Sequence, residues 1–331
     1  MAEVSAPEKH ELQTMVEGLH QKYLPLSSGE VASYIPELTK ANPDDFGISL
    51  VTADGQVFEA GNLDTPFTIQ SISKPFTFGM AIEEFGHDTV WQYVGIEPSG
   101  DAFNSIELED GTNRPFNPMV NSGAIAVTSL LYAQHTDGAF DHLLSRFSAM
   151  AGRRLSIDPA VYESERRTGH RNRAIAHLLM NFGVVRADAE AALDLYFRQC
   201  SILVTAHDLA VMGATLSNMG RNPITGVSVI DPMCVKDMLS IMFTCGMYDY
   251  SGHWAYRVGI PAKSGVAGGV LAVVNRQLGI GTYSPRLDVH GNSCRGIEAC
   301  TELANRLGLH VFDCLNVGSS FLTTVLEGQS A

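Results

Sequence analysis

Lysine is scarce in this chain, and basic residues as a whole are outnumbered. Six lysines occur in 331 residues, and 22 lysine and arginine side chains stand against 36 aspartates and glutamates, for a formal net charge of −14. This acidic balance disfavours nucleic acids and anionic membranes as partners and suits a protein that handles small molecules. Because lysines are so few, the two that fall within apolar stretches, Lys74 and Lys263, are informative.

Signals for disulfides, metal sites and membrane segments are also missing. The six cysteines, at positions 200, 234, 245, 294, 300 and 314, form no Cys-x-x-Cys pair, so we expect reduced thiols and a cytoplasmic protein. Residues 1–20 lack the pattern of an export signal, and no run approaches the roughly 18 apolar residues of a membrane span. The eleven histidines show no metal-binding spacing, so we expect them to be structural or exposed, with no metal and no cofactor.

Strand-like segments lie towards both ends of the chain. Residues 11–23 have helical periodicity, and residues 47–52 and 56–60 resemble two strands joined by Asp54-Gly55, a strong hairpin signal. Residues 259–283 are rich in glycine and β-branched side chains, as in packed antiparallel strands. A last helix is predicted over 294–307, with Asn292-Ser293 as its cap.

Helical periodicity dominates the middle of the chain. It predicts helices at 140–150, 173–182, 187–197, 206–219 and 232–243, and residues 205–208 form a capping-box signal. We therefore predict an α+β fold in which both chain ends build one antiparallel sheet and an all-helical domain is inserted between them. The expected sheet domain comprises residues 1–70 and 246–331, and the helical domain residues 71–245.

A Ser-x-x-Lys pair, Ser71 and Lys74, opens the helical region. Residues three apart share a helix face, so the serine hydroxyl and the lysine amine are expected within hydrogen-bonding reach. A lysine can accept a serine proton only if burial or a second cation keeps it partly neutral, and the flanking apolar residues fit such burial. Taken alone, the motif is short enough to arise by chance, and a solvated lysine near a helix start is the competing interpretation.

A second motif, Lys263-Ser264-Gly265, begins the C-terminal strand region. Together with Ser-x-x-Lys and a polar element around Asn121, it has the order found in serine β-lactamases and penicillin-binding proteins. Lys263 would add positive potential that disfavours a proton on Lys74, and the backbone amides of Ser71 and Val266 could face a developing oxyanion. The glycines at 265, 268 and 269 are expected to let substrate approach the strand closely.

Beyond these motifs, the sequence resembles the serine-dependent glutaminase family in its short bacterial form, a family with a β-lactamase-like fold. The resemblance covers residues 25 to 305. The matching segments are residues 33–36 (Ser-Tyr-Ile-Pro), 97–100 (Glu-Pro-Ser-Gly), 117–125, 164–166, 171–172, 196–197, 200–201, 246–249, 261–269, 283–288 and 291–293.

The resemblance implies hydrolysis of L-glutamine to L-glutamate and ammonia through an acyl-serine intermediate, and a homotetrameric assembly. It implies that Ser71 is the nucleophile and Lys74 its activating base, with Tyr248 and Lys263 as further catalytic residues. The implied glutamine-binding positions are Tyr34, Ser71, Asn121, Glu165, Asn172, Tyr196, Tyr248 and the backbone of Val266. This set offers one carboxylate for an ammonium and neutral donors for a carboxylate and an amide, which suits free glutamine.

Pattern alone favours ordinary roles for several of these residues. Glu165 lies in a charged stretch typical of a solvated, ion-paired helix face, and Tyr196 in an apolar helix is by default a core residue. Asn121 could be a turn residue and Lys263 a salt-bridged strand end. Two other functions also fit the catalytic motifs: a β-lactam or ester hydrolase on the same fold, and a non-catalytic glutamine sensor.

Overall fold

The main sheet is antiparallel and draws strands from both ends of the chain. The computed structural model describes residues 9–100, 106–186 and 188–313. The strand order is β3 (Val57–Gly61), β2 (Gly47–Thr52), β9 (Leu278–Tyr283), β8 (Gly269–Val274) and β7 (Ala262–Ser264). The predicted hairpin is present, with Val51 opposite Val57, and β2 pairs directly with β9. The sheet predicted from both chain ends is therefore confirmed.

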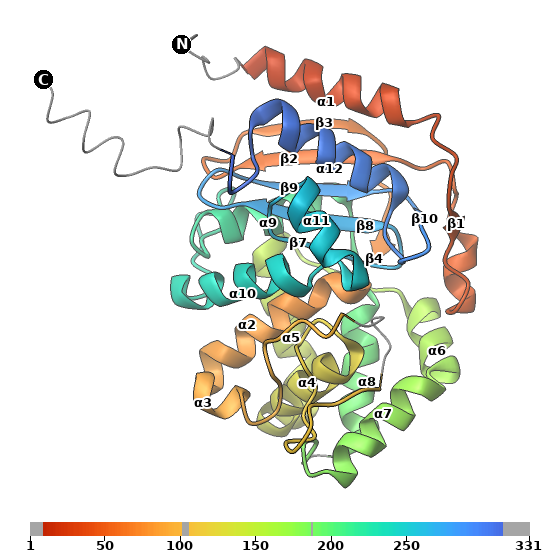
Figure 1. The fold of residues 1–331 in the computed structure, drawn as a ribbon, viewed down its shortest axis with the longest axis vertical. Coiled ribbons are helices and arrows are strands. Elements are labelled where there is room, and N and C mark those ends of the chain that lie inside the picture. The colour runs from red at the N-terminus through yellow and green to blue at the C-terminus, as the bar shows by residue number, and fades with distance from the viewer. Residues whose placement is uncertain (1–8, 101–105, 187, 314–331) are drawn as a thin grey trace, which may run out of the picture.

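Three helices from the two chain ends cover one face of the sheet (Figure 1). They are α1 (Lys9–Tyr23), α11 (Ser251–Arg257) and α12 (Cys294–Leu307). Buried residues such as Leu19, Ile280 and Leu303 form a continuous core between these helices and the strands. The predicted cap of the last helix is confirmed, because Ser293 Oγ accepts a hydrogen bond from the amide of Gly296 at 3.3 Å.

The other face of the sheet is covered by α9 (Ala206–Ser217), which packs against β9, β2 and β8. Gly281 makes this close packing possible, because a Cβ atom there would lie 2.1 Å from the backbone oxygen of Ala206. The capping box predicted at its start is confirmed: Thr205 and Asp208 each accept a hydrogen bond from the other's backbone amide.

The remaining helices form a block below the sheet in Figure 1. They are α2 (Lys74–Phe85), α3 (His87–Val90), α4 (Asn121–His135), α5 (Ala139–Ala151), α6 (Pro159–Thr168), α7 (His170–Asn181), α8 (Ala189–Cys200) and α10 (Pro232–Cys245). The periodicity did not predict α4, whose first eleven residues are all buried, so it has no polar face to create a repeat.

The remaining elements are short. They are the pair β1 (Glu30–Val31) and β10 (Arg286–Leu287), the small sheet of β4 (Phe67–Thr68), β6 (Ile202–Val204) and β5 (Ser156–Ile157), and the 3-10 helices η1 (Pro36–Lys40), η2 (Gln70–Ser73), η3 (Thr136–Gly138) and η4 (Tyr248–Tyr250). The domain boundaries 1–70, 71–245 and 246–331 stay a prediction. Within 71–245, α9 packs on the sheet, and β5 and β6 are strands.

Two expectations about absent features concern the described residues only. Over the ranges given above, no helix combines the length and apolar character needed to cross a bilayer. The described cysteines, at 200, 234, 245, 294 and 300, are unpaired thiols, as expected. Cys314 lies outside the described residues.

Candidate active site

Ser71 lies where the helical block meets the edge strand of the sheet. It belongs to η2, and α2 starts three residues later at Lys74, so the two motif residues are on consecutive helical segments. η2 contacts β7, β8 and α8, which leaves the Ser71 side chain almost buried. The residue before it, Gln70, has φ +49°, in the left-handed region that non-glycine residues rarely adopt. Such backbone strain is concentrated at functional sites.

Tyr248 lies beside Ser71, close enough for the serine hydroxyl to influence its pKa. The Tyr248 hydroxyl donates a hydrogen bond to the carbonyl of Ser264 at 3.1 Å. Tyr248 also has a left-handed backbone, with φ +58°. Burial raises the pKa of Tyr248 to about 12, while the Ser71 contact acts in the opposite direction. At neutral pH it is therefore a neutral phenol that can pass or donate a proton.

Lys74 is completely buried, so the interpretation of a solvated lysine is wrong. Its Nζ atom donates to Asn121 Oδ1 at 2.7 Å and to the carbonyl of Met119 at 3.0 Å. No hydrogen bond joins Lys74 Nζ to Ser71 Oγ, both of which lie in the described part of the chain, so the predicted direct contact is not formed. Burial lowers the pKa of Lys74 to about 8, and the negative charge of Glu165 opposes this shift.

Lys263 is also completely buried and makes no salt bridge among the described residues. Its Nζ atom donates to the carbonyl of Ser264 at 2.8 Å and lies 4.0 Å from the centre of the Tyr248 ring. Burial lowers the pKa of Lys263 well below its ordinary value, and the positive charge of Lys74 lowers it further. The predicted effect of Lys263 on Lys74 is therefore wrong, because burial and not Lys263 lowers the pKa of Lys74.

Asn121 connects three of the predicted site residues. It is the first residue of α4, and its Oδ1 atom accepts hydrogen bonds from Lys74 and from the Tyr196 hydroxyl, the latter at 3.4 Å. Its Nδ2 atom donates to Asn172 Oδ1 at 3.0 Å. Asn172 therefore accepts through its oxygen, and its own amide nitrogen remains available as a donor to a ligand.

Glu165 lies inside the site and not on a solvated face. It is 5% exposed, and its Oε2 atom has no hydrogen-bond partner. The arginine one residue on, Arg166, pairs with Glu163 instead. Burial raises the pKa of Glu165 to about 8, and the positive charge of Lys74 opposes this shift. A buried carboxylate oxygen without a hydrogen-bond partner lowers the stability of the fold, so its presence points to a cationic ligand group.

Tyr34 and Tyr196 line the same region from different segments. Tyr34 is 52% exposed, yet its hydroxyl is desolvated and faces the negative charge of Glu165, and both effects raise its pKa well above the ordinary value. Tyr196 is buried on α8, and burial together with the charge of Glu165 raises its pKa as well. Both tyrosines are neutral hydrogen-bond donors at physiological pH.

Val266 lies in the turn between β7 and β8. Apart from bonds within helices and strands, the amides of Val266 and Ser71 donate no backbone hydrogen bond in the described part of the chain, which suits them to an oxyanion. The neighbouring glycines allow close packing within the protein, and the approach of substrate to them stays a prediction. A Cβ on Gly265 would lie 3.0 Å from the backbone oxygen of Ile69, and one on Gly269 would lie 2.7 Å from the Phe67 ring.

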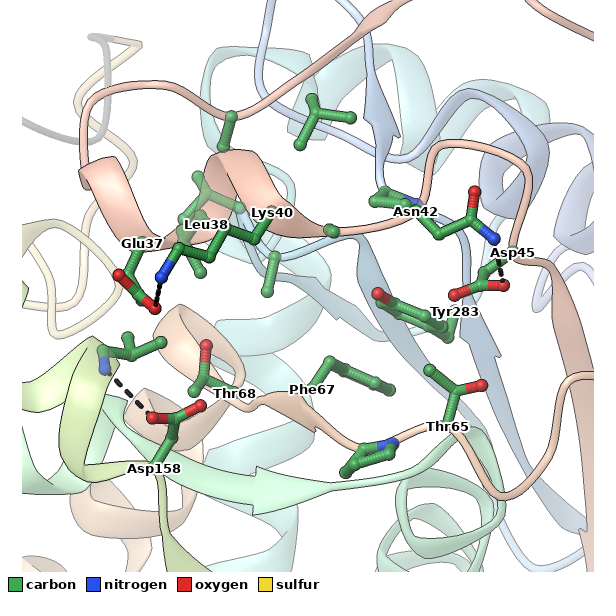
Figure 2. Close-up of a pocket in the computed structure, with 18 of the residues that line it drawn as sticks. Glu37, Leu38, Lys40, Asn42, Asp45, Thr65, Phe67, Thr68, Asp158 and Tyr283 are labelled. Carbon is green, nitrogen blue, oxygen red and sulfur yellow. Dashed lines mark hydrogen bonds and ion pairs between the residues drawn. The ribbon is translucent and has the colours of Figure 1, made fainter.

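A pocket of about 400 Å³ borders this site without containing it. Figure 2 shows it between η1 and β4, with Phe67 and Tyr283 on one side and Glu37, Lys40 and Asp158 on the other. Val266 contributes to its lining, whereas Ser71, Lys74 and Glu165 do not. The Phe67 and Tyr283 rings stack with centres 4.1 Å apart and form a wall next to Val266.

Comparison with known proteins gives a family that agrees with this geometry. The family model described as Glutaminase matches residues 29–312. The chain belongs to the glutaminase family. A glutaminase of Trichormus variabilis is 54% identical over 306 residues, which cover 92% of each chain, and glutaminase 2 of Clostridium perfringens is 46% identical over 92% of this chain and all of its own.

Solved structures agree with the glutaminase fold. The probable glutaminase ybaS superimposes with a TM-score of 0.89 at 41% identity, covering 92% of this chain and 99% of its own. Mglu in its glutamate form superimposes with a TM-score of 0.87 at 44% identity, covering 91% of this chain and 70% of its own. The predicted β-lactamase-like α+β fold is confirmed, and this glutaminase is an amide hydrolase that converts L-glutamine to L-glutamate and ammonia.

Sequence reasoning missed two contributors to the site. The carbonyl of Met119 holds the Lys74 amine, and the strained backbone at Gln70 presents Ser71. The motif around Asn121 contains Met119, but a backbone carbonyl leaves no residue-type signal. A glutamine with positive φ is equally invisible in the sequence, because its conformation is imposed by the surrounding packing.

Proposed function

We propose that the glutaminase reaction proceeds through a glutamyl ester of Ser71. The Ser71 oxygen attacks the side-chain amide carbon of glutamine, the C–N bond breaks, and ammonia leaves with the serine proton. Water then attacks the ester and returns one proton to Ser71, which releases glutamate. Each half-reaction forms one bond to carbon and breaks one, so no oxidant, reductant or cofactor is needed.

The observation that carries the proposal is the partnerless, buried Oε2 atom of Glu165 in the same site as Ser71. An α-ammonium group provides the missing partner, and its positive charge would lower the raised pKa of Glu165 and favour the ionised carboxylate. We assign the remaining ligand groups to neutral donors: Asn172, Tyr196 and Tyr34 for the α-carboxylate, and the amides of Ser71 and Val266 for the oxyanion.

Proton transfer is assigned to Lys74 and Tyr248. The lowered pKa of Lys74 leaves part of the population neutral near pH 7.5, so Lys74 can accept the Ser71 proton once substrate brings the hydroxyl towards it. Tyr248 lies beside Ser71 as a neutral phenol, so we assign it the donation of a proton towards the leaving nitrogen. Lys263 acts through Tyr248, because it supports the tyrosine ring and shares the Ser264 carbonyl with it.

Replacement of Ser71 tests the assignment. Ser71→Ala should abolish ammonia release from glutamine while circular dichroism and the unfolding midpoint stay close to wild type, because the side chain loses a single hydroxyl. Ser73→Ala is the matched control, since Ser73 is buried two residues away and bonds to Gln70 O at 2.7 Å. Wild-type turnover in Ser71→Ala would show that Ser71 is not the nucleophile.

The rival functions give different results in two assays. Hydrolysis of a chromogenic cephalosporin faster than glutamine would favour a β-lactam hydrolase, and tight glutamine binding without ammonia would establish a sensor. A homotetramer and a cytoplasmic location are further proposals, supported by the family resemblance and by the unpaired cysteines. Light scattering at the mass of one 35.8 kDa chain would refute the tetramer.

A further inference from the structure

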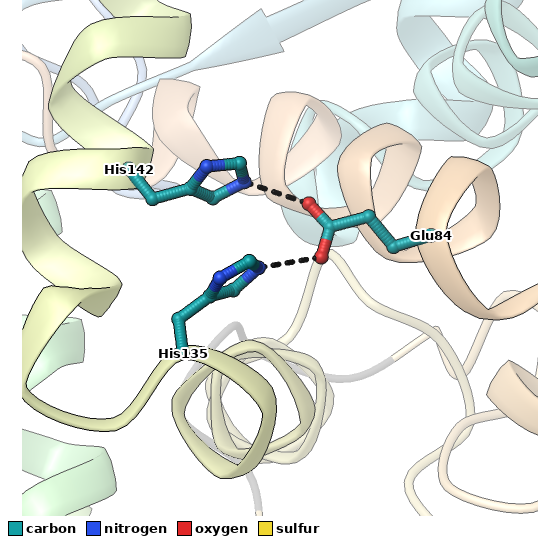
Figure 3. A group of neighbouring side chains, drawn as sticks. All are labelled: Glu84, His135 and His142. Atoms are coloured by element: carbon teal, nitrogen blue, oxygen red, sulfur yellow. Dashed lines mark hydrogen bonds and ion pairs between the residues drawn. The ribbon is translucent and has the colours of Figure 1, made fainter.

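Two histidines and a glutamate from three helices converge on the surface of the helical block. Glu84 lies near the end of α2, His135 is the last residue of α4, and His142 is in the first turns of α5. His135 Nε2 lies 2.8 Å from Glu84 Oε2, and His142 Nε2 lies 2.7 Å from Glu84 Oε1. Figure 3 shows both imidazole edges directed at the same carboxylate.

The arrangement differs from the other histidine–carboxylate contacts in the described residues. The others, His87 with Asp237, His177 with Glu190, His207 with Glu59 and His290 with Asp249, each join one ring to one acid. Here a single carboxylate bridges two rings, and the rings stack with centres 4.0 Å apart. One ligand atom from each of the three side chains lies within 4.8 Å of the others. Bonds of about 2.0–2.1 Å from zinc to nitrogen and oxygen require only small side-chain rotations from this geometry.

We propose that Glu84, His135 and His142 form a binding site for a divalent transition metal, with Zn²⁺ as the best match. Two imidazoles and one carboxylate are ligands that zinc prefers, whereas Mg²⁺ and Ca²⁺ prefer oxygen ligands alone. The side chains are 21% to 32% accessible, so water can complete a four-coordinate shell. The neighbouring cation, Arg146, is paired with Glu83 and does not contact the three ligands in the described structure.

The site lies at the far ends of two helices that begin in the catalytic centre. Lys74 is the first residue of α2 and Asn121 the first of α4, and these two residues are hydrogen-bonded to each other. Glu84 follows ten residues after Lys74, and His135 fourteen residues after Asn121, so the site is about 15–21 Å from the catalytic centre. A metal there would clamp α2, α4 and α5 without touching the substrate, so we expect stabilisation and no effect on basal turnover.

The experiment titrates ZnCl₂ into the full chain after removal of bound metal with EDTA and dialysis. We expect one equivalent to bind in isothermal calorimetry and to raise the thermal unfolding midpoint by about 4 °C at a hundredfold excess over the dissociation constant. MgCl₂ should do neither. Co²⁺ should give visible absorption bands typical of a low-symmetry site with nitrogen ligands, and these should disappear on addition of zinc.

Variants separate this site from general metal binding at the surface. His142→Gln and His135→Gln should each lower zinc affinity at least tenfold, while turnover without metal stays at the wild-type level. His177→Gln is the matched control, because His177 is an exposed histidine paired with Glu190 at 3.3 Å without a second ring. Equal zinc binding in His142→Gln and wild type would overturn the proposal. If that variant failed to fold, absence of the cobalt bands in the wild type would overturn it instead.

Discussion

Replacement of Glu165 by glutamine is the perturbation that most specifically tests how this glutaminase recognises an amino acid. Glutamine has nearly the same shape as glutamate, so the buried side chain keeps its packing and loses its charge. In the wild type, the 5% exposed carboxylate has an oxygen without a partner, which the α-ammonium of the substrate can satisfy. In Glu165→Gln, that ammonium enters a buried site without an opposite charge.

The size of the effect follows from the burial. Removing one partner of a buried charge pair costs about 3–5 kcal/mol, and each 1.36 kcal/mol is a factor of ten in rate. We therefore expect kcat/KM for glutamine to fall roughly 10²- to 10⁴-fold in Glu165→Gln. An activated monoester of glutaric acid keeps the carboxylate but lacks the amino group, so its hydrolysis should fall less than about tenfold in the same variant.

The assay measures kcat/KM for both substrates in wild type, Glu165→Gln and Glu163→Gln. Glu163 is the matched control on the same helix, because its side chain is 46% exposed and pairs with Arg166 at the surface. Both activities should be near wild type in the control. An equal fractional loss on glutamine and on the ester in Glu165→Gln would refute the reasoning, because Glu165 would then support the catalytic groups and not the ammonium.

Three further predictions concern proton transfer and packing. Since burial lowers the pKa of Lys74 to about 8 and only neutral Lys74 can accept a proton, kcat/KM should rise from pH 6 to pH 8 and then level off; a flat profile would contradict this. Tyr248→Phe should lower kcat about 10²- to 10⁴-fold with little change in KM, and kcat/KM should still rise from pH 6 to pH 8 in this variant. If that rise were lost, Tyr248 and not Lys74 would be the base. Gly281→Ala should destabilise the fold by about 1–3 kcal/mol in urea unfolding, because its Cβ would lie 2.1 Å from Ala206 O, whereas Gly18→Ala, with no atom within 4 Å, should not.

Much of the fold was predictable because its elements have local signals. The hairpin at residues 47–61 has Asp54-Gly55 in the turn between its strands, and the helix at 294–307 begins at a serine cap, so both predictions held. The helix α4 was missed since burial on all sides removes its amphipathic period. The close packing of α9 on the sheet depends on glycines of β9, such as Gly281. These glycines are far from α9 in the sequence, so no local pattern predicts the contact.

The candidate site was accessible from motifs, whereas its internal contacts were not. Ser71 and Lys74 were identified by spacing, yet the lysine amine bonds to Asn121 and not to the serine. Ser71 belongs to η2, a 3-10 helix that ends just before α2, so its side-chain direction differs from that in one continuous α-helix. The cluster of Glu84 with two histidines was not predicted either, because His135 and His142 lie 51 and 58 residues after Glu84 in the sequence.

The central claim is that glutamine hydrolysis passes through an ester on Ser71, and intact-protein mass spectrometry after rapid acid quench tests it most directly. Wild-type enzyme mixed with glutamine should show a transient species heavier by one glutamyl group, and fragmentation should place that group on Ser71. Ser73→Ala should form the same species, and Ser71→Ala should not. Ammonia release at the wild-type rate with no adduct in Ser71→Ala, or an adduct on a different residue, would contradict the account.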